Sequence, residues 1–247
     1  MRCEVIAHES ALGPFNMAAD EVLLGMVEAA PERGVLRTYE WSEPTLSLGY
    51  FQSWEAARAI DASQRVCRVR RITGGGAIWH DQEITYALAM PRQHPACRDV
   101  EALYDCVHDH IRNRLNQAGF PVKFRPGDVE TPGGERPFLC FQDQSTHDLV
   151  LGSRKVVGSA QRRKPRAVLQ HGSVLLRASS LLPRVPGIAE GDASIESLRE
   201  IVISCLRDLP ASLGMDGSPA SWSDGEQRRI VELAAGRYAT AGWTRRR

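Results

Sequence analysis

The run of three glycines at Gly74–Gly76 constrains the fold of this chain more than any other feature of its sequence. The run lies between two stretches that alternate like β-strands, Arg65–Arg71 and Ile84–Met90. Because glycine lacks a Cβ, such a loop can turn sharply and bring its backbone amides against a ligand. Three glycines alone are equally consistent with a simple hairpin turn. The charged residues around them and a second segment downstream favour a binding loop.

The second segment contains Lys155 in an apolar strand pattern flanked by Gly152 and Gly158. Lysine occurs in this chain only at positions 123, 155 and 164, and arginine supplies the other permanent positive charges. Arginine would serve as well at a solvated surface, so a lysine in this pattern indicates a compact ammonium group with a specific task. A lysine at the exposed end of a strand is the alternative that the pattern leaves open.

Together these segments resemble the biotin and lipoate protein ligase and transferase family. The resemblance is carried, in the family's order, by residues 15–21, 70–81, 84–89, 152–163, 169–176 and 237–243. It implies an α+β fold, with a mixed β-sheet and helices packed on it. It also implies a single catalytic domain over residues 1–247, with C-terminal helices from about residue 194 packed on the rest.

The resemblance leaves two branches open, and Cys140 bears on the choice between them. Similarity to the cysteine-dependent octanoyltransferases implies that Cys140 is the catalytic nucleophile, because it precedes Phe141 ahead of the strand with Lys155. The ATP-using lipoate ligases do not characteristically have a cysteine here. The segment Gln142–Asp148 lacks the proline and the aromatic residue that the transferases tend to have. A buried structural thiol is the alternative for Cys140.

The family motifs supply the remaining site residues. Cys140 and Lys155 are expected to be catalytic, since a thiol ionises little at neutral pH without an electropositive neighbour. The residues expected to bind the substrate are Arg71, Gly74, Gly75, Gly76, Ala77, His80, Gly158, Ser159, Ala160, His171 and Gly172. Amides of the glycine loop would stabilise an oxyanion, and the expected walls of the acyl slot are Ala77, Ile78 and Leu169. His80 and His171 are as readily explained as hydrogen-bonded structural residues.

Cofactors and partners follow from the branch. A transferase would need no cofactor, whereas a ligase would need ATP and Mg²⁺; no metal site within the protein is expected. The resemblance implies octanoyl acyl-carrier protein as the donor and lipoyl domains as acceptors, either the glycine cleavage H protein or a 2-oxoacid dehydrogenase E2. The choice between octanoyl and lipoyl stays open.

A non-catalytic protein that binds lipoyl domains would keep the glycine loop without needing thiol or lysine, and biotin transfer has little to favour it. Arg162, Arg163 and Arg166 are expected to dock the acidic carriers.

Composition limits the other functional classes. A net charge of +1 over 247 residues argues against extensive binding of a nucleic-acid backbone. The sequence shows neither an apolar run of membrane-spanning length nor the apolar core of a signal peptide, so we expect a cytoplasmic protein without membrane partners. The six cysteines lack CxxC or zinc-ligand spacing and are expected to be free, with Cys106 and Cys205 on the apolar faces of helices.

Periodicity predicts the main elements. Helices are predicted over Asn16–Ala30, Val100–Gly119, Ile195–Leu209 and Ser223–Thr240. Strands are predicted over Val35–Tyr50 with a break at Pro44, Arg65–Arg71, Ile84–Met90, Leu149–Val157 and Val168–Arg177. Strands joined by hairpin-length connections and interspersed with helices imply a mixed sheet with helices against one face.

Overall fold

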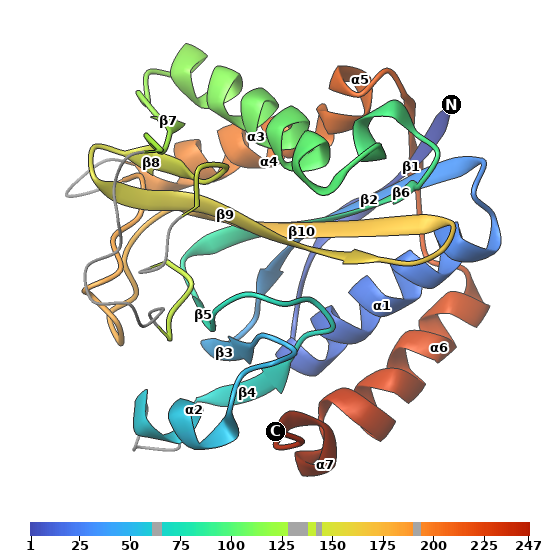
Figure 1. Ribbon diagram of the computed structural model, residues 1–247, viewed down its shortest axis with the longest axis horizontal. Helices are drawn as coiled ribbons and strands as arrows, with labels where there is room; N and C mark the ends of the chain where they lie inside the picture. The colour runs from blue at the N-terminus through green and yellow to red at the C-terminus, as the bar shows by residue number, and fades with distance from the viewer. Residues whose placement is uncertain (61–65, 128–137, 142–144, 190–193) are drawn as a thin grey trace.

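The computed structural model describes residues 1–60, 66–127, 138–141, 145–189 and 194–247, and a mixed sheet of eight strands lies at the centre of this described part (Figure 1). The strands in spatial order are β11 (Asp216–Ala220), β1 (Arg2–Ala11), β2 (Arg33–Trp41), β6 (Glu83–Pro91), β10 (Ala167–Leu175), β9 (Arg154–Arg163), β8 (Leu149–Leu151) and β7 (Lys123–Phe124). β1 is parallel to β11 and β2, and the other neighbours pair antiparallel. The predicted α+β fold with a mixed sheet is confirmed.

Helices cover both faces of this sheet, so the prediction of helices against one face is wrong. α1 (Gly13–Ala29) and α6 (Asp224–Leu233) lie on one face, and α3 (Val100–Gln117) and α4 (Ile195–Arg207) lie on the other (Figure 1). The reason lies in β6 and β10, where every residue is buried. A strand that is apolar on both sides needs cover on both sides.

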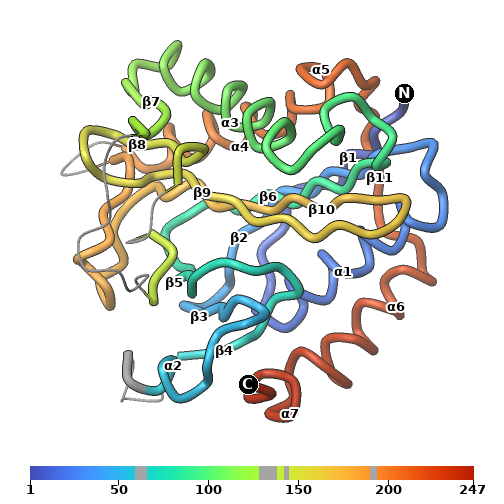
Figure 2. The backbone as a smooth tube through the Cα atoms, in the orientation of Figure 1, coloured from blue at the N-terminus to red at the C-terminus, as the bar shows by residue number. Residues whose placement is uncertain are grey.

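A second, smaller sheet positions the glycine loop. In the described part of the chain it consists of β4 (Cys67–Arg70), β3 (Thr45–Leu48) and β5 (Ile78–His80), in that order, and Figure 2 shows all three on the same side of the main sheet as α1. The glycine loop joins β4 to β5 within this sheet. The short helix α2 (Trp54–Ile60) follows β3 in sequence.

The C-terminal segment returns to the small sheet. The predicted helix over Ser223–Thr240 is α6 followed by the π-helical turn η2 (Ala234–Tyr238), after which α7 (Ala241–Thr244) packs beside β4. The indole of Trp243 donates a hydrogen bond to the Arg70 carbonyl at 2.8 Å. The end of the described chain therefore lies close to the glycine loop.

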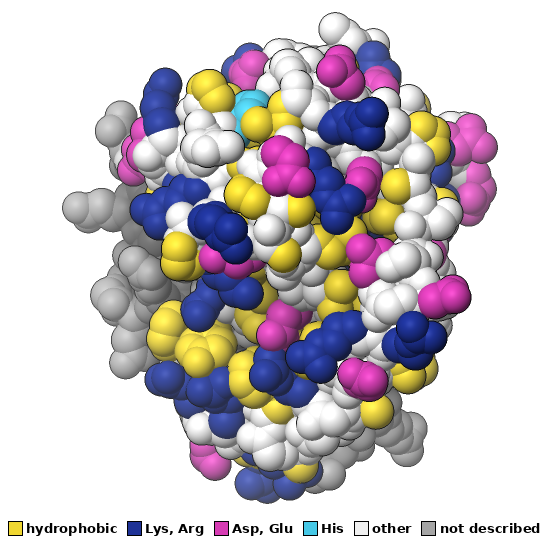
Figure 3. All heavy atoms as spheres, turned by 90° about the vertical axis from the view of Figure 1, so that its right-hand side faces the viewer, with side chains coloured by type: hydrophobic (Ala, Val, Ile, Leu, Met, Phe, Trp, Pro, Cys, Tyr) yellow, Lys and Arg dark blue, Asp and Glu magenta, His cyan; other side chains and the backbone are white. Residues whose placement is uncertain are grey.

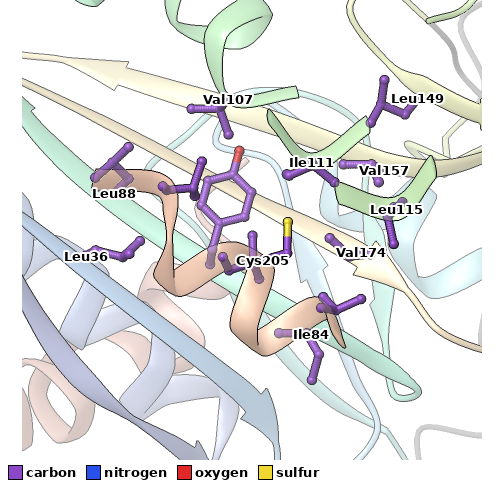
Figure 4. Close-up of a cluster of buried hydrophobic side chains, with 14 of the residues drawn as sticks. Leu36, Ile84, Leu88, Val107, Ile111, Leu115, Leu149, Val157, Val174 and Cys205 are labelled. Carbon is purple, nitrogen blue, oxygen red and sulfur yellow. The ribbon is translucent and has the colours of Figure 1, made fainter. Parts of the chain in front are cut away.

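The larger hydrophobic core lies between the main sheet and helices α3 and α4 (Figure 4). Val107, Ile111 and Leu115 of α3 contribute every fourth residue to it, and Cys205 of α4 is buried there as predicted. Cys106 is exposed, so its predicted burial is wrong. The buried stripe of α3 runs through Val107, Ile111 and Leu115, and Cys106 lies beside that stripe. All six cysteines are free, as predicted. The remaining short elements are η1 (Pro95–Cys97) and α5 (Leu209–Ser212).

Candidate active site

Cys140 and Lys155, which the sequence motifs pair as the expected catalytic residues, meet in the structure. The ammonium nitrogen Nζ of Lys155 lies 3.5 Å from the Cys140 sulfur and 3.1 Å from the Cys140 carbonyl oxygen. Lys155 lies near the start of β9 and is only 5% exposed, so the exposed strand-end alternative is wrong. A partly buried thiol with an ammonium group at hydrogen-bonding distance is an arrangement suited to a nucleophilic cysteine.

Asp148 completes this group and was missed by the sequence analysis. Its carboxylate lies 2.8 Å from the Lys155 ammonium and accepts a hydrogen bond from the Ser145 amide at 2.6 Å. Burial by itself lowers the pKa of Lys155, but the negative charges of Cys140 and Asp148 outweigh that effect and hold the pKa above its ordinary value. An aspartate just before a strand carries no local signal of such a contact. We refer to Cys140, Lys155 and Asp148 as the charged triad.

Arg71 holds the glycine loop in place through hydrogen bonds to backbone carbonyl groups. Its buried guanidinium donates hydrogen bonds to the carbonyl oxygens of Gly74 at 2.8 Å, Gly76 at 2.6 Å and Ser47 at 3.0 Å. Burial lowers the pKa of Arg71 to about 10. Three carbonyl partners leave this residue better suited to shaping the loop than to contacting a substrate directly.

The loop is also joined to the cysteine segment. The Ala77 amide donates to the Phe138 carbonyl at 2.8 Å, and the Cys140 amide donates to the Ala77 carbonyl at 2.7 Å. A Cβ on Gly76 would lie 2.9 Å from the Cys140 nitrogen and 3.0 Å from the Phe138 oxygen. Only glycine therefore allows the loop to pass this close to the reactive residue. The Gly75 and Gly76 amides are the candidates for binding an oxyanion.

We expect the substitution Gly76→Ala to lower the acyl transfer that the family resemblance implies by at least about tenfold, because a misplacement of about 1 Å costs an active site that much or more. The new methyl group would push against backbone atoms, which cannot rotate away. The measurement is the transfer rate alongside the melting temperature. Gly25→Ala in α1 is the matched control, since its Cβ meets nothing within 4 Å. Equal rates in both variants would contradict the close fit.

A small cavity of about 30 Å³ adjoins Cys140. Its wall includes Cys140 together with the predicted residues Arg71, Gly75, His80, Ser159, Ala160, His171 and Gly172. The wall also contains residues that the sequence analysis did not name, namely Met17, Tyr39, Trp41, Ser47, Thr85 and Ser173. Of the three expected wall residues, Ile78 lines the cavity, whereas Ala77 and Leu169 pack into separate hydrophobic clusters.

Gly158 and Gly172, two of the predicted site residues, leave space for the side chains of Lys155 and Ser159. A Cβ on Gly158 would lie 2.5 Å from Cε of Lys155, and a Cβ on Gly172 would lie 2.1 Å from the Ser159 hydroxyl. That hydroxyl is hydrogen-bonded to the His108 ring at 2.6 Å and to the Tyr86 hydroxyl at 2.7 Å. Glycine at these positions lets the lysine extend toward the cysteine and lets the serine join a buried polar network.

The two histidines of the motifs have both ring nitrogens engaged. His171 lies 2.7 Å from the Asp20 carboxylate and 2.7 Å from the Thr73 hydroxyl. His80 contacts Glu83 and Ser47, each at 2.7 Å, and burial lowers its pKa. The geometry favours a structural use of the nitrogens, and both side chains line the cavity.

The described part of the chain holds no cluster of three or more His, Cys, Asp or Glu side chains arranged for a metal ion. No helix within it is both long and apolar enough to cross a bilayer.

Comparison with known proteins places this chain in a family. The family model described as the lipoyl protein ligase A/B catalytic domain matches residues 13–194. The chain belongs to this family. Within the family it is 31% identical to octanoyltransferase LipM of Moorella thermoacetica, over 94% of this chain and 93% of that protein. Octanoyltransferase LipM of Kyrpidia tusciae is 33% identical, over 92% of this chain and 82% of its own length. The solved structure of lipoate-protein ligase A bound with ATP shares the fold, with a TM-score of 0.74 and 20% identity over 99% of both chains.

Proposed function

We propose that this protein is an octanoyltransferase that moves an octanoyl group to one lysine of a lipoyl domain through a thioester on Cys140. The observation that carries the proposal is the 3.5 Å contact between the Cys140 sulfur and the Lys155 ammonium beside a cavity. The relatives named as octanoyltransferases support the same reaction. We further propose that residues 1–247 work as one catalytic domain, since α4 and α6 both pack on the elements that hold the site.

In the first step the Cys140 thiolate attacks the carbonyl carbon of the donor thioester. The bond from that carbon to Sγ forms, and the bond to the donor's sulfur breaks. Lys155 gives its proton to the leaving thiolate, so the donor departs as a thiol and Lys155 becomes a neutral amine. Thioester exchanges for thioester, and the proposed reaction therefore needs neither nucleotide nor metal ion.

In the second step the lysine amine of the acceptor attacks the Cys140 thioester. The amide bond forms, the carbon–sulfur bond to Cys140 breaks, and Lys155 takes the proton lost by the amine. The electrostatics favour this sequence, because acylation removes one of the two negative charges that raise the pKa of Lys155, while burial continues to lower it. The same lysine is thus a stabilising cation before acylation and more readily a neutral amine, able to accept a proton, after it.

The test is to incubate the protein with octanoyl acyl-carrier protein and no ATP, and then to measure its intact mass. The expected result is an octanoyl adduct on Cys140 that disappears when an unmodified lipoyl domain is added. A protein that acquires no adduct, and that modifies the lipoyl domain only with free acid, ATP and Mg²⁺, would be a lipoate ligase instead.

Asp148 should act through Lys155, and Asp148→Asn tests it as a positioning residue. Removing this anion removes one cause of the raised pKa of Lys155, so the ammonium loses its proton at lower pH. We expect kcat/KM to fall about tenfold or more and its alkaline limb to move to lower pH. Asp105→Asn is the control, because Asp105 pairs with His147 on the exposed side of α3. A pH profile that stays in place while the rate falls would indicate a purely structural role.

A further inference from the structure

Exposed arginines from two distant parts of the chain gather around one aromatic side chain. The guanidinium carbons of Arg162, Arg246 and Arg247 lie 5.6, 4.5 and 5.4 Å from the centre of the Tyr50 ring. Arg246 also donates a hydrogen bond to the Tyr50 hydroxyl at 3.0 Å. With the exposed residues Arg245 and Phe51 these form what we call the basic surface: Tyr50, Phe51, Arg162, Arg245, Arg246 and Arg247. Figure 3 shows basic side chains around hydrophobic ones in the lower part of one face of the molecule.

The positive charge of this surface is not neutralised within the part of the chain that the structure describes. None of its four arginines forms a salt bridge there. The other two predicted docking residues differ: Arg163 donates hydrogen bonds to the Cys97 and Asp99 carbonyls, and Arg166 lies 4.0 Å from the Glu28 carboxylate. Of the arginines expected from sequence to dock the carriers, only Arg162 belongs to the basic surface.

The basic surface adjoins the candidate active site across the glycine loop. The Tyr50 amide donates to the Thr73 carbonyl at 2.8 Å, and the Phe51 ring lies 4.0 Å from where a Cβ of Gly74 would be. On its other side the loop packs against Cys140 through Gly76. Arg162 also follows the cavity residue Ala160 by two positions in β9, which puts both on the same face of the strand.

We propose that the basic surface is the docking site for the acidic protein domains that deliver and accept the acyl group; this inference rests on the proposed function. Four unneutralised arginines attract an acidic domain, and the exposed Phe51 adds apolar contact area. Both domains must reach the Cys140 sulfur, so one surface serves them in turn. Arginines interleaved with aromatic rings also suit single-stranded nucleic acid. The net charge of +1 and the position beside the thiol favour the acyl-carrying domains.

The test is the triple variant R162E/R245E/R246E. We expect kcat/KM for octanoyl acyl-carrier protein and for the lipoyl domain to fall at least about tenfold at low salt, with a flatter salt dependence. The control variant R207E/R228E/R229E changes the net charge equally at exposed arginines elsewhere and should keep both values within about twofold of the parent. If both triple variants lose activity equally, net charge rather than this surface is responsible, and the proposal is overturned.

A small uncharged octanoyl thioester, used as the acyl donor, distinguishes a loss of docking from a loss of catalysis. It needs no docking surface, so the R162E/R245E/R246E variant should acylate Cys140 from it at the parent rate. Failure of the parent protein to acylate Cys140 from either donor would overturn the proposed function, whereas parental kinetics of the variant with both carriers would overturn the docking site alone. The docking site would also be overturned if the surface binds a single-stranded oligonucleotide while the variant keeps parental kinetics with both carriers. If melting temperature shows that the glutamate variant is unfolded, R162Q/R245Q/R246Q removes the charge with less disruption and should still lose at least about threefold.

Discussion

Cys140→Ala and Cys140→Ser are expected to abolish both the octanoyl adduct and the transfer, with a loss on the order of 10³-fold or more. Alanine has no nucleophile, and a serine hydroxyl is not ionised by an ammonium 3.5 Å away as a thiol can be. The measurements are intact mass after incubation with octanoyl acyl-carrier protein and the rate of lipoyl-domain modification.

Cys106→Ser is the matched control for this experiment, because Cys106 is a free thiol exposed on α3. It should keep the adduct and the full rate. Full transfer by Cys140→Ala together with a requirement for ATP would move the protein to the ligase branch and withdraw the thioester mechanism.

Lys155→Arg is expected to lower transfer by about 10²- to 10³-fold while leaving some acylation of Cys140. Arginine keeps a positive charge but does not give up its proton. It can therefore support both the attacking and the leaving thiolate by its charge, but it neither protonates the leaving group in the first step nor serves as the base in the second. We therefore expect the octanoyl adduct to accumulate in this variant when the acceptor is present. Quenched-flow intact mass distinguishes a stalled adduct from one that never forms.

Lys155→Met tests the charge itself. Without the ammonium, alkylation of Cys140 by a small neutral reagent should slow at neutral pH. Because this variant leaves the Asp148 carboxylate buried and unpaired, at a cost of about 3–5 kcal/mol, the double variant with Asp148→Asn checks that any loss is not unfolding. Lys164→Arg, in the turn after β9, is the control and should match the parent. A parental rate in Lys155→Arg would remove the lysine from the mechanism.

The sequence by itself determined the elements and residues whose signals are local. The strands β6 and β10 follow from strand-like sequence patterns, and α3 follows from its apolar spacing. The family motifs that named Cys140 and Lys155 are also local, because each is a continuous stretch of chain. The contact of these two residues is what the motifs implied and the structure shows.

Tertiary structure decided the features that depend on pairing between distant segments. The sequence of β1 mixes charged and apolar residues and has no local pattern strong enough to predict a strand. β3 and β4 lie within predicted strand ranges, but their pairing with β5 in a separate sheet has no local signal. Asp148 became a partner of Lys155 only through the bulged pairing of β8 with β9. Arg162 and Arg163 are neighbours in sequence, yet successive strand residues point to opposite faces. Only the folded chain shows that Arg162 joins the C-terminal arginines beside the glycine loop, because that proximity comes from α7 packing on β4.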